Sequence, residues 1–392
     1  MNTVNNIYPL ACSDSTDQWG DLRKLGEVLW SWCLCGTCTP ETVCKRPSCP
    51  WYNRNALAFF KKYYENMTSE YHPQARQQTV LNSRDNLLAI VQHMKQNPTS
   101  TRNELVKECF GNSDGQDPGP LVRRDRSRAV GMAASLIFCI DFGYEKADAG
   151  ENDPFRWEDG WRLNEIIGKV FPGSPGLTMP VSKDRWNQNS LKERFSAENL
   201  KKKIRGLSFE ATDDLRDHLR FHQDTRVLQV FQGTAVMKQI LLSSQTDANA
   251  CIIPRALAVE FCDTVYKLLF NYDNSASYKI LQGLVRKNDF YEDLKSYDLA
   301  LHQSDVENDD SYPYFGRRLN ILLKEMQDPS PANWFERLFD SGEKSAERRM
   351  LMMTMIGVAI TAVSSTLNLV VASYQAYVGY QAWQSQAREE RP

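Results

Sequence analysis

Apolar and polar residues recur with a helical period over most of the chain. In residues 83–97, 254–269 and 319–326 the apolar side chains return every three or four positions, which places them on one face of an amphipathic helix. Residues 204–209 and 226–231 instead alternate with a period of two and predict short strands. The pattern therefore predicts a mainly α fold with a small β element, of the α+β class.

The longest apolar run has a different character. Met350–Ala372 holds 23 residues without a charge, and no charged side chain occurs between Arg349 and Arg388. A helix of about 20 such residues spans the hydrocarbon core of a bilayer, so we expect one C-terminal transmembrane helix. A buried helix in a soluble fold is the alternative, but it would need an unusually long apolar element.

Small and polar residues within this run recur at helical spacing. They would share one stripe of the helix, and such stripes let transmembrane helices approach one another closely. The alternative is that they merely lower the hydrophobicity of a single-pass anchor. The residues of this stripe are Gly357, Thr361, Ser365 and Asn368.

Residues on both sides of the run predict its orientation. Aromatic residues follow it at every third position and are typical of a membrane interface; they are Tyr374, Tyr377, Tyr380 and Trp383. Residues 334–339 predict a short amphipathic helix at the opposite interface. Four basic residues precede the run closely and two follow it, which places the N-terminal region in the cytosol. The opening residues resemble no signal peptide, so we expect a tail-anchored protein of the endoplasmic reticulum or another intracellular membrane.

Composition bounds the rest of the prediction. The 392 residues have room for two or three domains, and the net charge of −2 creates no field that favours nucleic acid. Changes in pattern along the chain suggest six parts. They are a Cys-rich region (1–78), a three-helix module resembling a winged helix (79–150), a linker with a small β element (151–250), a helical region (251–349), the transmembrane helix (350–372) and a short tail (373–392).

The Cys-rich region carries a candidate metal site. Five cysteines fall within seventeen residues, and a cytosolic protein keeps its thiols reduced. Four of them form the pairs Cys35-x-x-Cys38 and Cys44-x4-Cys49, which supply the four ligands of a tetrahedral zinc ion. Only five residues separate the pairs, fewer than in ordinary zinc ribbons, so a redox-sensitive or unliganded loop remains the alternative.

Residues 79–150 predict three helices. Ser83 is a candidate cap for the first, and Thr101-x-x-Glu104 is a capping box for the second. The third, from about Val122 to Cys139, begins with four arginines and would enter a DNA major groove if the module bound nucleic acid. A packing unit with solvent-facing arginines is favoured, because the chain is acidic overall and predicted to be tethered to a membrane.

A second metal-ligand pattern lies in residues 214–222. On one helix Asp214, His218 and His222 would share a face and form a two-histidine, one-carboxylate site. The strand pattern that follows disfavours that helix, and capping with surface hydrogen bonding is the simpler interpretation. The chain has no Gly-x-Gly-x-x-Gly, Walker or Gly-x-Ser-x-Gly motif, so its catalytic residues, if any, are unknown and no cofactor other than zinc is expected.

Several stretches carry a family resemblance. They are residues 213–221, 227–241, 254–255, 312–319 and 374–383. Through them the chain resembles a family of filamentous-fungal proteins with a C-terminal membrane anchor, over residues 80 to 392. The resemblance implies no catalytic residue. Similar proteins would be encoded beside secondary-metabolite genes, so the resemblance also implies a role in a biosynthetic gene cluster. His222 stands where that family would have an acidic residue, which argues against the second metal site.

The function expected from these observations is non-catalytic. We expect a single-pass membrane protein that presents a cytosolic helical region to protein partners as an interaction or scaffold protein. One alternative is a membrane-associated enzyme of small-molecule biosynthesis, and another is a membrane-tethered nucleic-acid binder.

Overall fold

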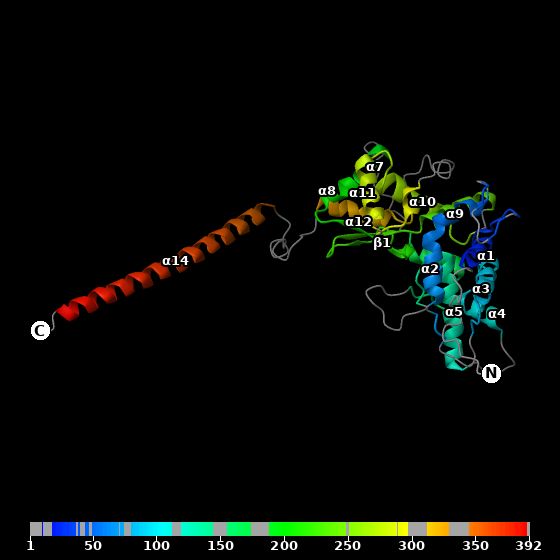
Figure 1. The fold of residues 1–392 in the computed structure, drawn as a ribbon, viewed down its shortest axis with the longest axis horizontal. Coiled ribbons are helices and arrows are strands. Elements are labelled where there is room, and N and C mark those ends of the chain that lie inside the picture. The colour runs from blue at the N-terminus through cyan, green and yellow to red at the C-terminus, as the bar shows by residue number, and fades with distance from the viewer. Residues whose placement is uncertain are drawn as a thin grey trace. The chain divides into compact units, whose positions relative to one another are not determined.

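The chain forms two units, Met1–Pro329 and Ser330–Pro392, which we describe separately. The computed structural model (Figure 1) describes residue 10 and residues 18–36, 38–39, 44–46, 49–69, 71–73, 80–111, 119–143, 155–173, 188–247, 251–287, 289–296, 312–328 and 345–389. The protein is mostly helical with one small sheet, as the periodicity predicted. The interfacial helix predicted at 334–339 lies outside the described residues.

The first part of the larger unit is helical. Its α-helices are α1 (Gln18–Trp30), α2 (Ala58–Ser69), α3 (Arg84–Gln96), α4 (Arg102–Phe110) and α5 (Pro120–Phe138). A 3₁₀ helix, η1 (Pro50–Leu57), leads into α2. Both predicted caps are confirmed, since the Ser83 and Thr101 side chains accept hydrogen bonds from the backbone N–H groups of Asn86 and Glu104. These local bonds fix where α3 and α4 begin.

The second part of the larger unit contains the sheet (Figure 1). Its helices are η2 (Leu163–Glu165), α6 (Ile166–Val170), α7 (Gln188–Arg194), α8 (Ala197–Lys203), η3 (Leu215–Asp217), α9 (Thr234–Thr246), α10 (Arg255–Asp263), the π-helical turn η4 (Thr264–Leu269), α11 (Ser275–Arg286), η5 (Glu292–Lys295) and α12 (Gly316–Gln327). The strands are β1 (Ser208–Thr212), β2 (Phe221–His222) and β3 (Val227–Phe231). The sheet order is β1-β3-β2, with β3 parallel to β1 and antiparallel to β2.

The strand predicted at 226–231 is confirmed, while the one predicted at 204–209 begins later. The N–H of Ile204 still donates to the carbonyl of Leu200 at the end of α8, and Gly206 turns the chain with a φ of +75°, so β1 starts at Ser208. Residues 214–222 do not form the single helix that the second metal-ligand pattern would need. Asp214 caps the short turn η3, and Leu219 at a φ of +60° prevents the helix from continuing.

One buried apolar cluster runs through the larger unit. It joins side chains from α1, such as Leu25, to side chains from α12, such as Leu322. The Cys-rich segment and the three predicted helices of 79–150 contribute to the same core. The six-part division of the sequence stays a prediction.

Two of the arginines at the start of α5 are bonded within the protein. The guanidinium of Arg126 lies 5.7 Å from the centre of the Phe110 ring, and Arg128 donates to the carbonyl of His72 at 2.9 Å. These contacts favour the packing interpretation of the module.

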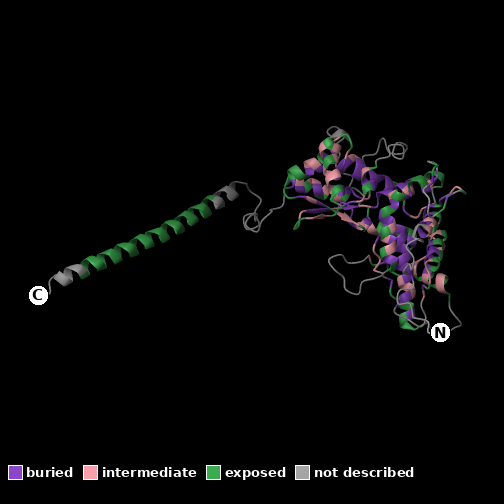
Figure 2. Cartoon of the chain, viewed as in Figure 1, coloured by how far each residue is buried: buried purple, intermediate pink, exposed green. Residues whose placement is uncertain are grey.

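The smaller unit contains one long helix, α14 (Ser345–Glu389). Of its residues, Met353–Gln384 form a segment long and apolar enough to cross a membrane, and every side chain of that segment is exposed within the structure (Figure 2). The predicted stripe is on this helix. The hydroxyls of Thr361 and Ser365 donate to the helix's own carbonyls at Gly357 and Thr361, at 2.7 and 2.8 Å.

Candidate metal centre

The four cysteines predicted as zinc ligands lie together. The sulfur of Cys35 is 3.0 Å from that of Cys38 and 3.5 Å from that of Cys44, and the sulfurs of Cys38 and Cys49 are 3.5 Å apart. All four sulfurs lie within 4.8 Å of one another. Zn–S bonds of about 2.3 Å in a tetrahedron put sulfurs about 3.8 Å apart, so the cluster has the dimensions of a four-thiolate zinc site.

Backbone turns place each pair of cysteines. The N–H of Cys38 donates to the carbonyl of Cys35 at 3.1 Å, which closes the Cys-x-x-Cys turn. In the second pair the N–H of Arg46 donates to the Cys44 sulfur at 3.4 Å, and Cys49 N–H donates to the Arg46 carbonyl at 3.0 Å. An N–H group aimed at a sulfur stabilises the thiolate, the form that binds metal.

Tryptophans hold the cluster against the core. Trp51 follows the last cysteine, is fully buried, and donates its indole N–H to the carbonyl of Thr39 at 3.0 Å. Its ring meets that of Trp32 edge to face at 6.1 Å. Three of the four ligand cysteines are buried, whereas Cys33 is exposed and lies outside the cluster.

Two of these thiols, Cys38 and Cys44, have a raised pKa. The hydrogen bond to Cys35 and, after it, burial raise the pKa of Cys38 well above its usual range. At Cys44 the Arg46 N–H lowers the pKa, but burial and neighbouring thiols leave it raised. Four thiolates at this separation repel one another, and a divalent cation at their centre offsets that repulsion.

The second metal-ligand pattern is not assembled. His218 is buried between the rings of Phe261 and Phe315, with its Nε2 2.8 Å from the Thr264 hydroxyl. Asp214 pairs with Arg216 at 2.7 Å, and His222 on β2 lies 3.1 Å from the side-chain oxygen of Gln229. Within the described part of the chain, the four cysteines are the group whose ligand atoms gather in this way. Asp214, His218 and His222 instead each contact another side chain of the fold.

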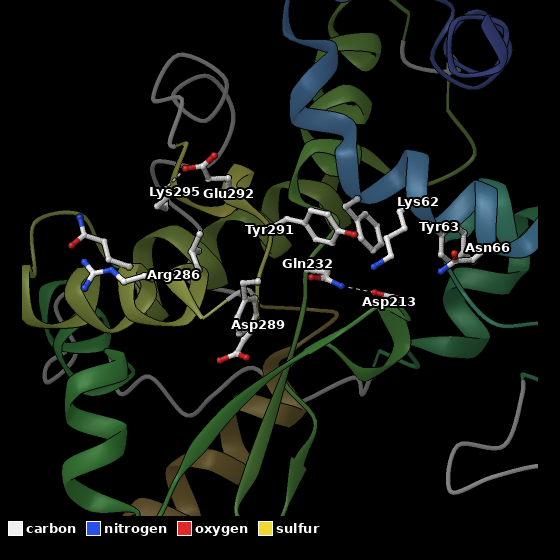
Figure 3. Close-up of a pocket in the computed structure, with 14 residues that line it drawn as sticks. Lys62, Tyr63, Asn66, Asp213, Gln232, Arg286, Asp289, Tyr291, Glu292 and Lys295 are labelled. Carbon is white, nitrogen blue, oxygen red and sulfur yellow. Dashed lines mark hydrogen bonds and ion pairs between the residues drawn. The ribbon is translucent and has the colours of Figure 1, made fainter. Parts of the chain in front are cut away.

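A cavity of about 890 Å³ lies apart from the cysteines, between α2, α11 and η5 (Figure 3). Its floor includes Asp213 and Gln232, which follow the parallel strands β1 and β3 directly, and the Gln232 amide donates to the Asp213 carboxylate at 2.5 Å. The lining holds three basic and three acidic side chains: Lys62, Arg286, Lys295, Asp213, Asp289 and Glu292. Ligands of parallel sheets bind beyond the carboxyl ends of the strands, and this cavity occupies that place.

Sequence reasoning missed this cavity. Its walls come from segments that are more than 200 residues apart in the chain, and no spacing rule joins them. The polar residues Asp213 and Gln232, close after the two predicted strands in the chain, were the available signal.

No family model, curated protein or solved structure matches this chain. The family resemblance therefore stays a prediction.

Proposed function

We propose that this chain is a membrane-anchored interaction protein whose larger unit is stabilised by zinc. One observation carries the proposal: the apolar side chains of Met353–Gln384 are all exposed. Nine of them are Leu, Ile or Val, and removing each such side chain from water contributes roughly 1.5–3 kcal/mol. A bilayer supplies that burial, and a helix of 32 residues is longer than the hydrocarbon core is thick.

The ends and hydroxyls of α14 suit this placement. Tyr380 and Trp383 are exposed near its C-terminal end, where an aromatic belt would meet the interface. Each stripe hydroxyl is bonded to the helix itself, so it enters lipid without an unsatisfied donor. With four basic residues before the span, the larger unit would face the cytosol of an intracellular membrane and present its surface to protein partners.

Fractionation tests the anchor. The full chain should pellet with membranes and resist extraction by alkaline carbonate, whereas a chain lacking residues 350–372 should be recovered in the supernatant. As a matched control, replacing the stripe residue Asn368 with Leu should leave the full chain membrane-bound. The anchor is refuted if the complete chain is extracted as readily as the truncated one.

A zinc ion at the cysteines would be structural. Four thiolates complete a tetrahedral coordination sphere and leave no position for substrate, so the ion would cross-link two turns rather than catalyse. Ligand-set chemistry supports zinc over Mg²⁺ or Ca²⁺, which prefer oxygen ligands.

Metal analysis tests this centre. The purified, reduced chain should contain one zinc per chain, and the Cys44→Ser variant should lose most of it and unfold at a lower temperature. Cys33→Ser provides the control, because this cysteine is two residues from Cys35 yet outside the cluster. Equal zinc content in the two variants would exclude the four-cysteine site.

The cavity between α2, α11 and η5 favours a second function, binding or conversion of a small polar molecule. Its volume falls within the range of ligand sites, and its charges are balanced. Mass spectrometry of small molecules that co-purify with the chain tests this function. An Asn66→Trp variant, altered at an exposed position of the lining, should lose the bound compound, and an empty wild-type chain would count against it.

A further inference from the structure

A second cavity, of about 410 Å³, lies between the end of α6, the turn from η3 to β2, and the first turns of α12. Four of its lining side chains are arginines, two from each of the last two segments: Arg216, Arg220, Arg317 and Arg318. Two carboxylates are bonded to this group, Asp214 to Arg216 at 2.7 Å and Asp217 to Arg220 at 2.9 Å. Among the described residues, two of these positive charges therefore form no ion pair with a carboxylate in this cavity.

The two arginines of α12 carry that excess. Arg317 is exposed, and the described residues show no hydrogen bond or ion pair to its guanidinium. Arg318 is partly buried and donates to the carbonyl of His218, which leaves most of its donors for another acceptor. Its guanidinium lies 5.4 Å from the centre of the Phe171 ring, and burial lowers its pKa to about 10. The nearby Asp217 and Asp214 raise this pKa only in part, so an anion in the cavity would stabilise the charged guanidinium further.

The remaining lining suits a ligand with an uncharged body. Phe171, Phe221 and Ile321 supply apolar contact beside the arginines. Glu260 accepts hydrogen bonds from the backbone N–H groups of Tyr314 and Phe315, but its side chain is not part of the lining. Arginine forks match phosphate oxygens in pairs, and a cavity of this volume holds a phosphate with a small attached group.

We propose that this arginine cavity binds a phosphate-bearing ligand. Seventeen residues separate the end of α12 from the start of α14 in the sequence, so a phospholipid headgroup and a free phosphate compound are both sources of the same chemistry. The cavity itself does not depend on membrane insertion, because all of its residues belong to the larger unit.

Calorimetry on the full chain in a non-ionic detergent tests the proposal. The probes are inorganic pyrophosphate, water-soluble dibutanoyl phosphatidylinositol 4-phosphate, and dibutanoyl phosphatidylcholine as the zwitterionic control. We expect binding of at least one of the first two, weakening as salt is raised. Preference for the short-chain lipid identifies a headgroup as the source, and preference for pyrophosphate identifies a soluble compound.

Variants locate the binding. Arg317→Gln should weaken it about tenfold, because a charge-assisted bond to the anion is lost. Ile321→Glu, which adds a carboxylate to the lining, should weaken it as well. Lys324→Gln provides the matched control, since it removes the same charge from an exposed position of α12 outside the cavity.

The proposal is overturned if neither phosphate probe binds, or if Lys324→Gln weakens binding as much as Arg317→Gln does. It is also overturned if phosphatidylcholine binds as tightly as the phosphate probes. Arg317 and Ile321 are both exposed, so their substitution should leave the fold intact, and the circular dichroism spectrum checks this.

Discussion

Glu260 gives the most demanding test of the fold. This carboxylate on α10 is buried, and it accepts the backbone N–H groups of Tyr314 and Phe315 at 3.0 and 2.6 Å, just before α12 begins. Burial raises the pKa of Glu260 from 4.5 to about 7, although the two N–H groups lower it. The cost of desolvating the charge therefore exceeds the gain from the hydrogen bonds.

The sign of the pH dependence follows from this shift. The folded state holds the proton more tightly than the unfolded state, so the contribution to stability is complete below pH 4.5. It is lost as the pH rises to about 7, because the unfolded state ionises first. A shift of about 2.5 pH units corresponds to about 3 kcal/mol.

Glu260→Gln removes the charge and keeps a side-chain oxygen that accepts hydrogen bonds. We expect the variant to match the wild type near pH 4.5 within about 1 kcal/mol, and to be more stable by about 3 kcal/mol at pH 8. Urea unfolding of the full chain in detergent, followed by circular dichroism between pH 4.5 and 8.5, measures both. Glu210→Gln, at an exposed position of β1, is the control and should leave the pH profile unchanged.

A loss of stability at pH 8 in Glu260→Gln would refute this reasoning. It would mean that the hydrogen bonds to the ionised carboxylate outweigh its desolvation. The ionised carboxylate would then stabilise the start of α12 at every pH above the ordinary pKa of a glutamate side chain.

Three further substitutions probe the core. Lys238→Met leaves the buried Asp293, 3.4 Å from the lysine, without its ion-pair partner and should cost about 3–5 kcal/mol in urea unfolding; no loss would mean that this ion pair contributes nothing to stability. Thr101→Ala removes the cap of α4 and should cost about 1 kcal/mol, while Ser100→Ala should be neutral if the cap is the cause. Gly233→Ala places a Cβ 2.4 Å from Phe231 and 2.8 Å from Phe59, so it should lower the melting temperature by overpacking at a cost of about 1–3 kcal/mol; unchanged melting would show that these rings move freely.

Local signals in the sequence predicted much of the fold. The caps at Ser83 and Thr101 depend on bonds that span three residues, and their residue types alone identify them. The apolar run of α14 is also local, since length and lack of charge suffice to single it out. The four cysteines were predictable as a group because they are close in the chain, whatever turns join them.

The features that could not be predicted from the sequence share a physical cause. The metal pattern at Asp214, His218 and His222 needed a helix, but Asp214 caps only the short turn η3, and the positive φ of Leu219 keeps the helix from continuing. Both cavities and the contact of Glu260 with α12 join residues that are distant in sequence. Such contacts are decided by tertiary packing, and no local period encodes them.

Hydrogen bonds near the end of α1 can form only after a much later part of the chain has been synthesised. Trp30 and Trp32, which lie next to the cysteines, are bonded to Ser243 and Gln239 of α9, more than 200 residues later in the chain. At 5–20 residues per second a ribosome needs about 10–40 s to produce those partners. Throughout that interval the nascent N-terminal segment lacks both of these bonds to α9. If the four cysteines bind zinc as proposed, an ion that arrives during translation would hold the two cysteine pairs together before α9 is made.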